Sequence, residues 1–239
     1  MMKKTVQGLM ALAVLLLSTG AAQARDLFQN MQLDVFVLGG GSTLVDAQNW
    51  QAAGVQYHSR LDHGTKFTVG VDVPYGKLLS IETAFSYGPN NLIVTNENVF
   101  PHVGVLYQAN NYLGSMSGVV HAPWTLFHLR PYAEGGVEYD RFSPTPAAIA
   151  LAYKQGFASV STAIMNHNDK FGCNLGVGLD RKIMKRLTFR IDLRDHITGS
   201  PAFGIPPRPN VNSIAAFPVS GRANNIEYTA GIVIHLGKL

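Results

Sequence analysis

The chain of 239 residues holds 19 Lys and Arg against 15 Asp and Glu, and only 14% of its residues are charged. Its mean hydropathy of +0.08 is high for a water-soluble exported domain, and its Lys and Arg do not form the usual runs that bind nucleic acid. The single cysteine, Cys173, excludes an intramolecular disulfide framework and a metal site made of cysteines alone. The composition therefore predicts neither a cofactor nor a nucleic-acid partner.

The N-terminus has the three parts of a secretory signal peptide. Lys3 and Lys4 precede a short apolar stretch, residues 9–17, and Ala22-Gln23-Ala24 is a small-residue cleavage site. The apolar stretch is shorter than the ~20 residues that a membrane-spanning helix needs. We therefore expect cleavage after Ala24, which divides the chain into a signal peptide, residues 1–24, and one exported domain, residues 25–239. Loss of the two lysines leaves 17 basic against 15 acidic residues.

Alternation of apolar and polar residues with period two recurs along the exported part. In residues 226–239, one side carries Ile226, Tyr228, Ile232 and Ile234, while the other carries polar or small residues. This pattern predicts strands with one apolar and one polar face. Eight such strands are expected, at about 31–38, 66–73, 78–87, 111–122, 129–141, 171–180, 187–196 and 226–239.

The connections between these strands alternate between short and long. Three are tight turns, and the four between them each run to roughly 15–30 residues rich in Pro, Asn and Gly. The sequence thus predicts an all-β fold, an eight-stranded antiparallel up-and-down transmembrane β-barrel with short periplasmic turns and long extracellular loops. An Ala-rich stretch, residues 147–165, is compatible with a short helix or with extensions of the flanking strands.

Which face points outward decides between a membrane barrel and a soluble, lipocalin-like barrel with an apolar interior. Three observations favour apolar residues outside: the sorting of the loops, the many Gly and Ser on the polar side, and aromatic residues near predicted strand ends. These aromatics are Tyr75, Trp124 and Phe127 at the turn side and Tyr87, Tyr112, Tyr139 and Phe142 at the loop side.

Several charged residues fall on the polar side and would meet inside such a barrel. Strands three and seven of an eight-stranded barrel face each other, so Arg190 is expected to meet Glu82, Glu134 or both, with Arg194 near Glu138. Pairing is expected because unpaired charges in a confined lumen are costly. The predicted lumen charge network, structural in role, contains Glu82, Glu134, Glu138, Arg190, Asp192 and Arg194.

Four stretches together with the closing strand resemble a known family. They are residues 85–92 (FSYGPNNL), 130–137 (RPYAEGGV), 171–180 and 189–198 (FRIDLRDHIT). With these the chain resembles the bacterial outer-membrane β-barrel domain family, the small OmpA/OmpX-like barrels. The resemblance implies an outer-membrane location, contact with outer-membrane lipid and recognition by the barrel-assembly machinery. The residues that match the assembly signal are Thr229, Gly231, Ile234 and Leu236; aliphatic residues replace the usual aromatics there.

Three chemical alternatives have weaker support. Residues 39–42 (GGGS) lack the Lys-Ser/Thr of a phosphate-binding loop and are expected to form the exit from the first strand. A lipid A hydrolase would need His and Ser together on the outer wall; His58 with Ser59, or His196 with Ser200, are the candidates. Loop residues could gather a metal ion, namely His58, Asp62, His63, His167 and Asp169.

The function expected from the sequence is that of an integral outer-membrane β-barrel protein, not an enzyme, with a structural or adhesin-like, surface-binding role. Its lumen is expected to be plugged by charged side chains, and an extracellular ligand would bind through the long loops. A monomer is expected. The alternatives are a narrow, porin-like pore for small solutes and a lipid A-modifying outer-membrane enzyme.

Overall fold

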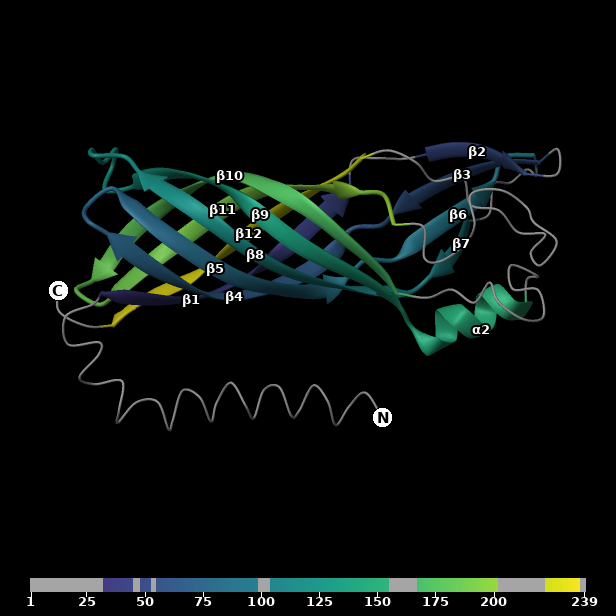
Figure 1. Ribbon diagram of the computed structural model, residues 1–239, viewed down its shortest axis with the longest axis horizontal. Helices are drawn as coiled ribbons and strands as arrows, with labels where there is room; N and C mark the ends of the chain where they lie inside the picture. Colours follow the sequence, from purple (N-terminus) through teal and green to yellow (C-terminus); the bar gives the residue numbers. More distant parts are fainter. Residues whose placement is uncertain are drawn as a thin grey trace.

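The computed structural model describes residues 32–44, 48–52, 55–98, 104–154, 167–201 and 222–236. Eight antiparallel strands form a closed barrel in the order β1-β12-β11-β10-β9-β8-β5-β4 (Figure 1). The barrel strands are β1 (Leu33–Leu44), β4 (Gly64–Tyr75), β5 (Leu79–Pro89), β8 (Ala109–His121), β9 (Arg130–Pro144), β10 (Asn168–Met184), β11 (Leu187–Gly199) and β12 (Arg222–Leu236). The predicted all-β, eight-stranded antiparallel fold is confirmed.

The barrel closes between the first and last of its strands. β1 pairs with β12 along the whole of β1, from Leu33 opposite Leu236 to Leu44 opposite Asn225. Three short turns, β4–β5, β8–β9 and β10–β11, lie at the end where β1 begins and β12 ends; we call it the turn end. The opposite end is the loop end. The predicted sorting of short and long connections is therefore present.

The strands are longer than the sequence predicted, mostly at the loop end. β1 continues through Gly39, Gly40 and Gly41 to Leu44, so the interpretation of residues 39–42 as a strand exit was wrong. A side chain at Gly40 would collide with β12, because its Cβ would lie 1.9 Å from the carbonyl oxygen of Tyr228. Glycine there permits the close approach of the two closing strands.

Apolar side chains point out of the barrel and polar side chains point in. Along β5, Leu79, Ile81 and Phe85 are about half exposed, whereas Ser80 and Glu82 between them are buried. β11 repeats the pattern with Ile191 and Leu193 outside. A soluble barrel would show the reverse order, since its interior must be dry. The wall therefore has the character of a lipid-facing surface.

The loop end carries a second, smaller layer of structure that the sequence prediction treated as loops. Strands β2 (Gln48–Ala52), β3 (Val55–Leu61), β6 (Leu92–Asn96) and β7 (Gly104–Tyr107) form a four-stranded sheet in the order β2-β3-β6-β7. Helix α2 (Pro146–Lys154) packs against β7. The Ala-rich stretch thus forms a helix over its first part, and residues 155–166 lie outside the described residues.

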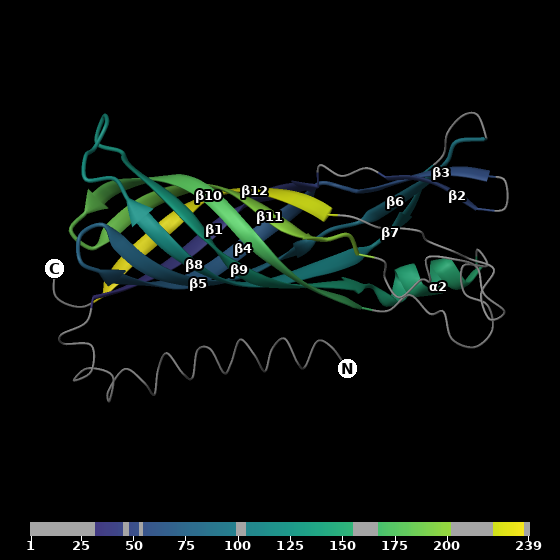
Figure 2. The same ribbon diagram turned by 45° about the horizontal axis from the view of Figure 1, so that its top comes forward.

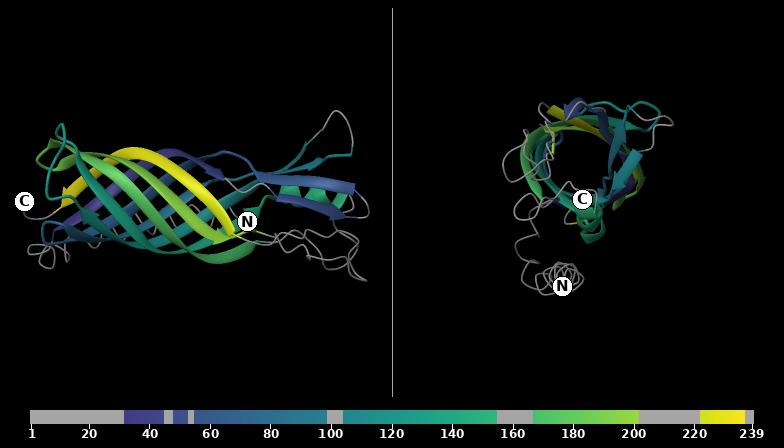
Figure 3. Two further views of the ribbon diagram at one scale, coloured as in Figure 1. Left: turned by 90° about the horizontal axis from the view of Figure 1, so that it is seen from above. Right: turned by 90° about the vertical axis from the view of Figure 1, so that its right-hand side faces the viewer.

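This sheet and α2 extend beyond the barrel (Figure 2), and we call them the loop-end platform. Its sheet has a packed face, with Leu92, Val94 and Tyr107 buried. Burial raises the pKa of Tyr107 to about 12. Viewed along the barrel axis, the barrel strands form a closed ring (Figure 3, right). Among the described residues, no helix is long and apolar enough to cross a membrane.

Candidate functional site

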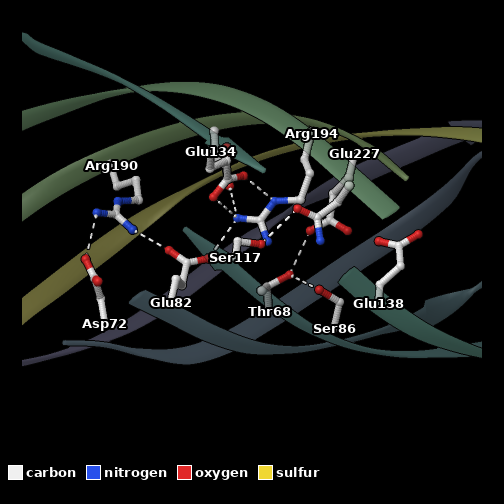
Figure 4. A network of polar contacts seen from close by, with 12 residues as sticks. Thr68, Asp72, Glu82, Ser86, Ser117, Glu134, Glu138, Arg190, Arg194 and Glu227 are labelled. Atoms are coloured by element: carbon white, nitrogen blue, oxygen red, sulfur yellow. Dashed lines mark hydrogen bonds and ion pairs between the residues drawn. The ribbon is translucent and has the colours of Figure 1, made fainter. Parts of the chain in front are cut away.

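Two arginines of β11 occupy the middle of the lumen and bind carboxylates from five strands, β4, β5, β9, β10 and β11 (Figure 4). Arg190 donates from Nη1 to Oε2 of Glu82 and from Nε to Oδ1 of Asp180, both at 2.9 Å. Arg194 donates from Nη2 to Oε1 of Glu82 at 2.9 Å and to Oδ2 of Asp192 at 2.8 Å. Its Nε and Nη2 both contact Glu134. Glu82 therefore joins the two arginines into one network.

These side chains are almost completely shielded from solvent, with Arg190 2% exposed and Arg194 4%. The period-two geometry of β11 explains why they meet, because residues 190, 192 and 194 all point inward from one strand. Buried charges of this kind are tolerated only when paired and hydrogen-bonded. Charged side chains therefore fill this part of the lumen.

The predicted pairing is partly right. Arg190 meets Glu82, as expected, but Glu134 binds Arg194. Glu138 does not contact Arg194; instead, its Oε2 lies 2.6 Å from Nδ1 of His196. The strand register explains the shift, because Gly176 of β10 lies opposite both Glu134 and Arg194. Glu138 is consequently level with the residues that follow Arg194 on β11.

His196 is the centre of a second buried polar cluster, next to this network on β11. Its Nε2 lies 3.2 Å from Oε2 of Glu227 on β12, and the other oxygen of Glu227 accepts a hydrogen bond of 2.8 Å from Thr68 on β4. One imidazole therefore connects four strands through Glu138 and Glu227. The sequence analysis missed this role, although inward parity with Arg190 and Arg194 on the same strand was the available signal.

Further polar contacts occupy both ends of the lumen. Toward the loop end, Asn111 connects Lys66 with Asp140. At the turn end, His235 lies 2.8 Å from Asp34, and His121 lies 3.2 Å from Asp180. The buried carboxylates outnumber the buried Lys and Arg: Asp34, Asp72, Glu82, Glu134, Glu138, Asp140, Asp192 and Glu227 against Lys66, Arg190 and Arg194. The lumen is therefore acidic.

Apolar side chains complete the filling. Phe36, Leu38, Ala84 and Val233 pack together inside the barrel, and the guanidinium carbon of Arg190 lies 5.5 Å from the centre of the Phe36 ring. Toward the loop end, Phe142 and Leu113 are both 0% exposed. An eight-stranded barrel is just wide enough for its inward side chains, so this packing occupies the interior.

The residues considered for a lipid hydrolase are not assembled on the outer wall. His196 is buried in the lumen and bound to Glu138 and Glu227, and Ser200 is buried as well. His58 and Ser59 lie on β3 of the loop-end platform, where the His58 ring is hydrogen-bonded to Asn49. Neither pair presents a His and a Ser together toward lipid.

The loop residues considered for a metal ion are engaged with other partners. Nδ1 of His63 lies 2.6 Å from Oγ1 of Thr43, and Asp169 accepts two hydrogen bonds from the Arg141 guanidinium at 2.7 and 3.0 Å. Over the described part of the chain, no group of three or more His, Cys, Asp or Glu could hold a metal ion.

The outer wall carries aromatic residues near both ends. At the loop end, Tyr87 pairs with Tyr112 and Tyr139 with Phe171, with ring centroids 5.1 Å apart in both pairs. At the turn end, Tyr75, Trp124 and Phe127 are exposed. Phe142, which was predicted to join them outside, points into the lumen because its parity matches that of Glu138 and Asp140.

The four residues of the predicted assembly signal lie on two faces of β12. Thr229 is buried in the lumen, whereas Ile234 and Leu236 are exposed on the outer wall. Gly231 lies opposite Leu38 of β1, where an added Cβ would be 2.0 Å from the carbonyl oxygen of Val37. This close approach is a packing reason for the glycine, and recognition by the assembly machinery stays a prediction.

No protein-family model and no curated protein matches the sequence. The similarity is found at the level of structure. Outer membrane protein OprG from Pseudomonas aeruginosa has a TM-score of 0.54 with this chain at 13% identity, covering 86% of this chain and 96% of that one. The chain has the fold of the small outer-membrane barrels.

Two further structures are similar over comparable lengths. The N-terminal β-barrel domain of Pseudomonas aeruginosa OprF covers 86% of this chain and 97% of its own, at 11% identity and a TM-score of 0.40. The match to Neisserial surface protein A covers 85% of this chain and 96% of that protein, at 9% identity and a TM-score of 0.44. The fold rests on the likeness to OprG, and at 13% identity that likeness says nothing of the role of this chain.

Proposed function

We propose that this protein is an integral protein of the bacterial outer membrane, exported with cleavage after Ala24, with its turn end in the periplasm. The lipid-type wall and the aromatic residues near both barrel ends support this location. Assembly would use the barrel-assembly machinery, and the barrel would act as a monomer. Recovery of the full-length gene product in the soluble periplasmic fraction, rather than in the outer membrane as a heat-modifiable band, would overturn this proposal.

The role we propose is non-enzymatic surface binding through the loop-end platform. The observation that carries it is the platform itself, a sheet with buried Leu92, Val94 and Tyr107 that continues the barrel beyond its lipid-facing wall. Rigid scaffolds that hold exposed segments are typical binding devices. The filled, charge-paired lumen supports a scaffolding role for the barrel rather than a transport role.

The test compares the intact barrel with one that lacks the β2–β3 and β6–β7 extensions. Residues 45–63 and 90–108 would be replaced by short Gly-Asn turns, and folding would be checked by heat-modifiable migration. Both proteins, in nanodiscs, would be applied to a glycan array and to immobilised matrix proteins. We expect binding only by the intact protein; equal signals from the two would contradict a binding role for the sheet of the platform.

A narrow pore is the second candidate, and the excess of buried carboxylates over Lys and Arg is the observation that favours it. An acidic lumen would favour cations. We nevertheless expect no stable, discrete conductance in planar bilayers, because the network of Arg190, Arg194 and Glu82 and the packed Phe36 occupy the interior. Discrete cation-selective steps from the unmodified protein would favour the pore.

We also expect the lipid A of producing cells to keep its acyl pattern. Neither His and Ser pair considered is brought together on the outer wall, which supports this expectation, because an acyl-ester hydrolase needs the two side chains within hydrogen-bond reach. Mass spectrometry of lipid A from cells with and without the protein measures this. Loss of an acyl chain only in producing cells would contradict the non-enzymatic role.

A further inference from the structure

The three turns at the turn end carry a concentrated positive charge. They follow one another around the rim, because β4, β5, β8, β9, β10 and β11 are consecutive neighbours in the barrel. Residues 74–79, 121–130 and 181–187 contain no Asp or Glu, and their basic residues are Lys77, Arg130, Arg181, Lys182, Lys185 and Arg186. We call these three segments the turn-end rim.

No carboxylate within the three segments of the rim neutralises this charge. Lys77, Arg181, Lys182, Lys185 and Arg186 are all exposed. The nearest carboxylate in sequence, Asp180, binds Arg190 and His121 on the lumen side. Arg130 instead ties two of the turns together, because its Nε donates to the carbonyl of Ala122 at 3.0 Å and its Nη2 donates to that of Lys77.

The rim also exposes large apolar side chains beside its cations. Tyr75 is 80% exposed and Phe127 84%, and Trp124, Leu126, Ile183 and Met184 are each more than half exposed. In an aqueous compartment such a surface would be costly. Mixed aromatic and basic residues at this level are typical of the boundary between lipid and water.

The tight turn of the β8–β9 hairpin holds its apolar tip away from the barrel. Leu126 and Leu129 exchange two backbone hydrogen bonds of 2.8 Å, and the residues between them, Phe127 and His128, have φ of 51° and 66°. That turn normally uses Asn and Gly, which adopt positive φ readily. The hairpin projects sideways from the barrel end (Figure 2), toward the region that lipid occupies around the wall.

We propose that the turn-end rim binds anionic phospholipid headgroups in the periplasmic leaflet, with Trp124 and Phe127 inserted at headgroup level. The inference rests on the proposed outer-membrane location. Lipid is the partner that the rim fits because the rim continues the lipid-facing wall, where Leu79, Ile81 and Ile191 are about half exposed. Exposed Lys and Arg next to an anionic membrane surface attract its headgroups.

Trp124 provides a direct probe, since Trp50 is the only other tryptophan of the chain. The W50F protein would be reconstituted into phosphatidylcholine bilayers that contain 20 mol% phosphatidylglycerol, with one of the two lipids brominated in turn. We expect Trp124 to be quenched by both lipids, with an apparent affinity for brominated phosphatidylglycerol about fivefold higher than for brominated phosphatidylcholine. That ratio corresponds to the attraction of one basic residue for an anionic headgroup.

Two variants make the test specific. In K182Q/K185Q/R186Q, which keeps only Lys77 and Arg181 of the exposed rim cations, the preference for phosphatidylglycerol should fall well below fivefold. The matched variant R60Q/K154Q/R222Q loses the same charge from exposed positions at the loop end, and it should keep the preference. Equal quenching by both lipids in the W50F protein, or an unchanged preference in the rim variant, would overturn the proposal.

A second probe separates this inference from the location of the protein. In W50F/W124F/V137W the tryptophan stands on the outer wall, where Val137 is 66% exposed. Quenching there, without headgroup preference, is expected for any membrane-spanning barrel. Its absence would contradict the outer-membrane location itself. Quenching of the tryptophan at position 137 without quenching of Trp124 would contradict lipid binding by the rim but not the membrane location. It would point to a periplasmic protein as the partner of the rim.

Discussion

Replacing Arg194 with Met is expected to lower the free energy of unfolding by about 3–5 kcal/mol, the cost of removing one partner from a buried ion pair. The change leaves Glu82, Glu134 and Asp192 without the guanidinium that they share. These carboxylates are each at most 5% exposed, so water cannot replace the lost partner. Urea unfolding in phospholipid vesicles, followed by tryptophan fluorescence and heat-modifiable migration, measures the effect.

Arg141 is the matched control, because it also makes a two-point contact with a carboxylate but does so at the surface. Its side chain is 45% exposed and that of Asp169 33%. Exposed pairs contribute at most about 1 kcal/mol, so R141M should be nearly as stable as the unmodified protein. R194K keeps the positive charge but loses the planar guanidinium that contacts two carboxylates at once. Its free energy of unfolding should lie between those of R194M and R141M. Equal stability of R194M and R141M would contradict a stabilising lumen network.

The barrel could be predicted from the sequence because lipid and a polar lumen sort side chains by parity. β11 shows this most clearly, with Leu187, Phe189, Ile191 and Leu193 on one side and Thr188, Arg190, Asp192 and Arg194 on the other. The same alternation holds on β10, where Cys173 is exposed on the outer wall beside Leu175 and Val177. An even count of eight strands also implies that the first and last strands pair to close the barrel, as β1 and β12 do.

The ion-pair partners inside the lumen could be predicted only in part. The alternation along a strand shows whether a side chain points into the lumen, but not at which level along the barrel axis it lies. That level depends on strand register: at the turn end, β10 pairs with β9 only from Asp180 but with β11 already from Met184, four residues lower. Counting from the turns therefore assigned Glu138 to Arg194 rather than to His196. The loop-end platform was missed for a different reason: β2, β6 and β7 are only four or five residues long.

The closing strand gives the second large expected effect, in a G231A variant. A methyl group at Gly231 would lie 2.0 Å from the carbonyl oxygen of Val37 and 2.7 Å from Cα of Leu38. The backbone of β1 cannot yield as a flexible side chain would, so the seam between β1 and β12 must open. Overpacking of this kind costs about 1–3 kcal/mol or more. We expect little heat-modifiable protein from G231A, both in cells and after refolding in detergent.

Gly39 supplies the control on the neighbouring strand, since an added Cβ there meets no atom within 4 Å. G39A should assemble like the unmodified protein. The refolding experiment also separates the two roles of Gly231, because purified detergent micelles contain no assembly machinery. Failure in both settings would show that packing of the seam requires the glycine. Normal refolding in detergent together with failure in cells would contradict the packing explanation and assign the residue to the predicted assembly signal with Thr229, Ile234 and Leu236.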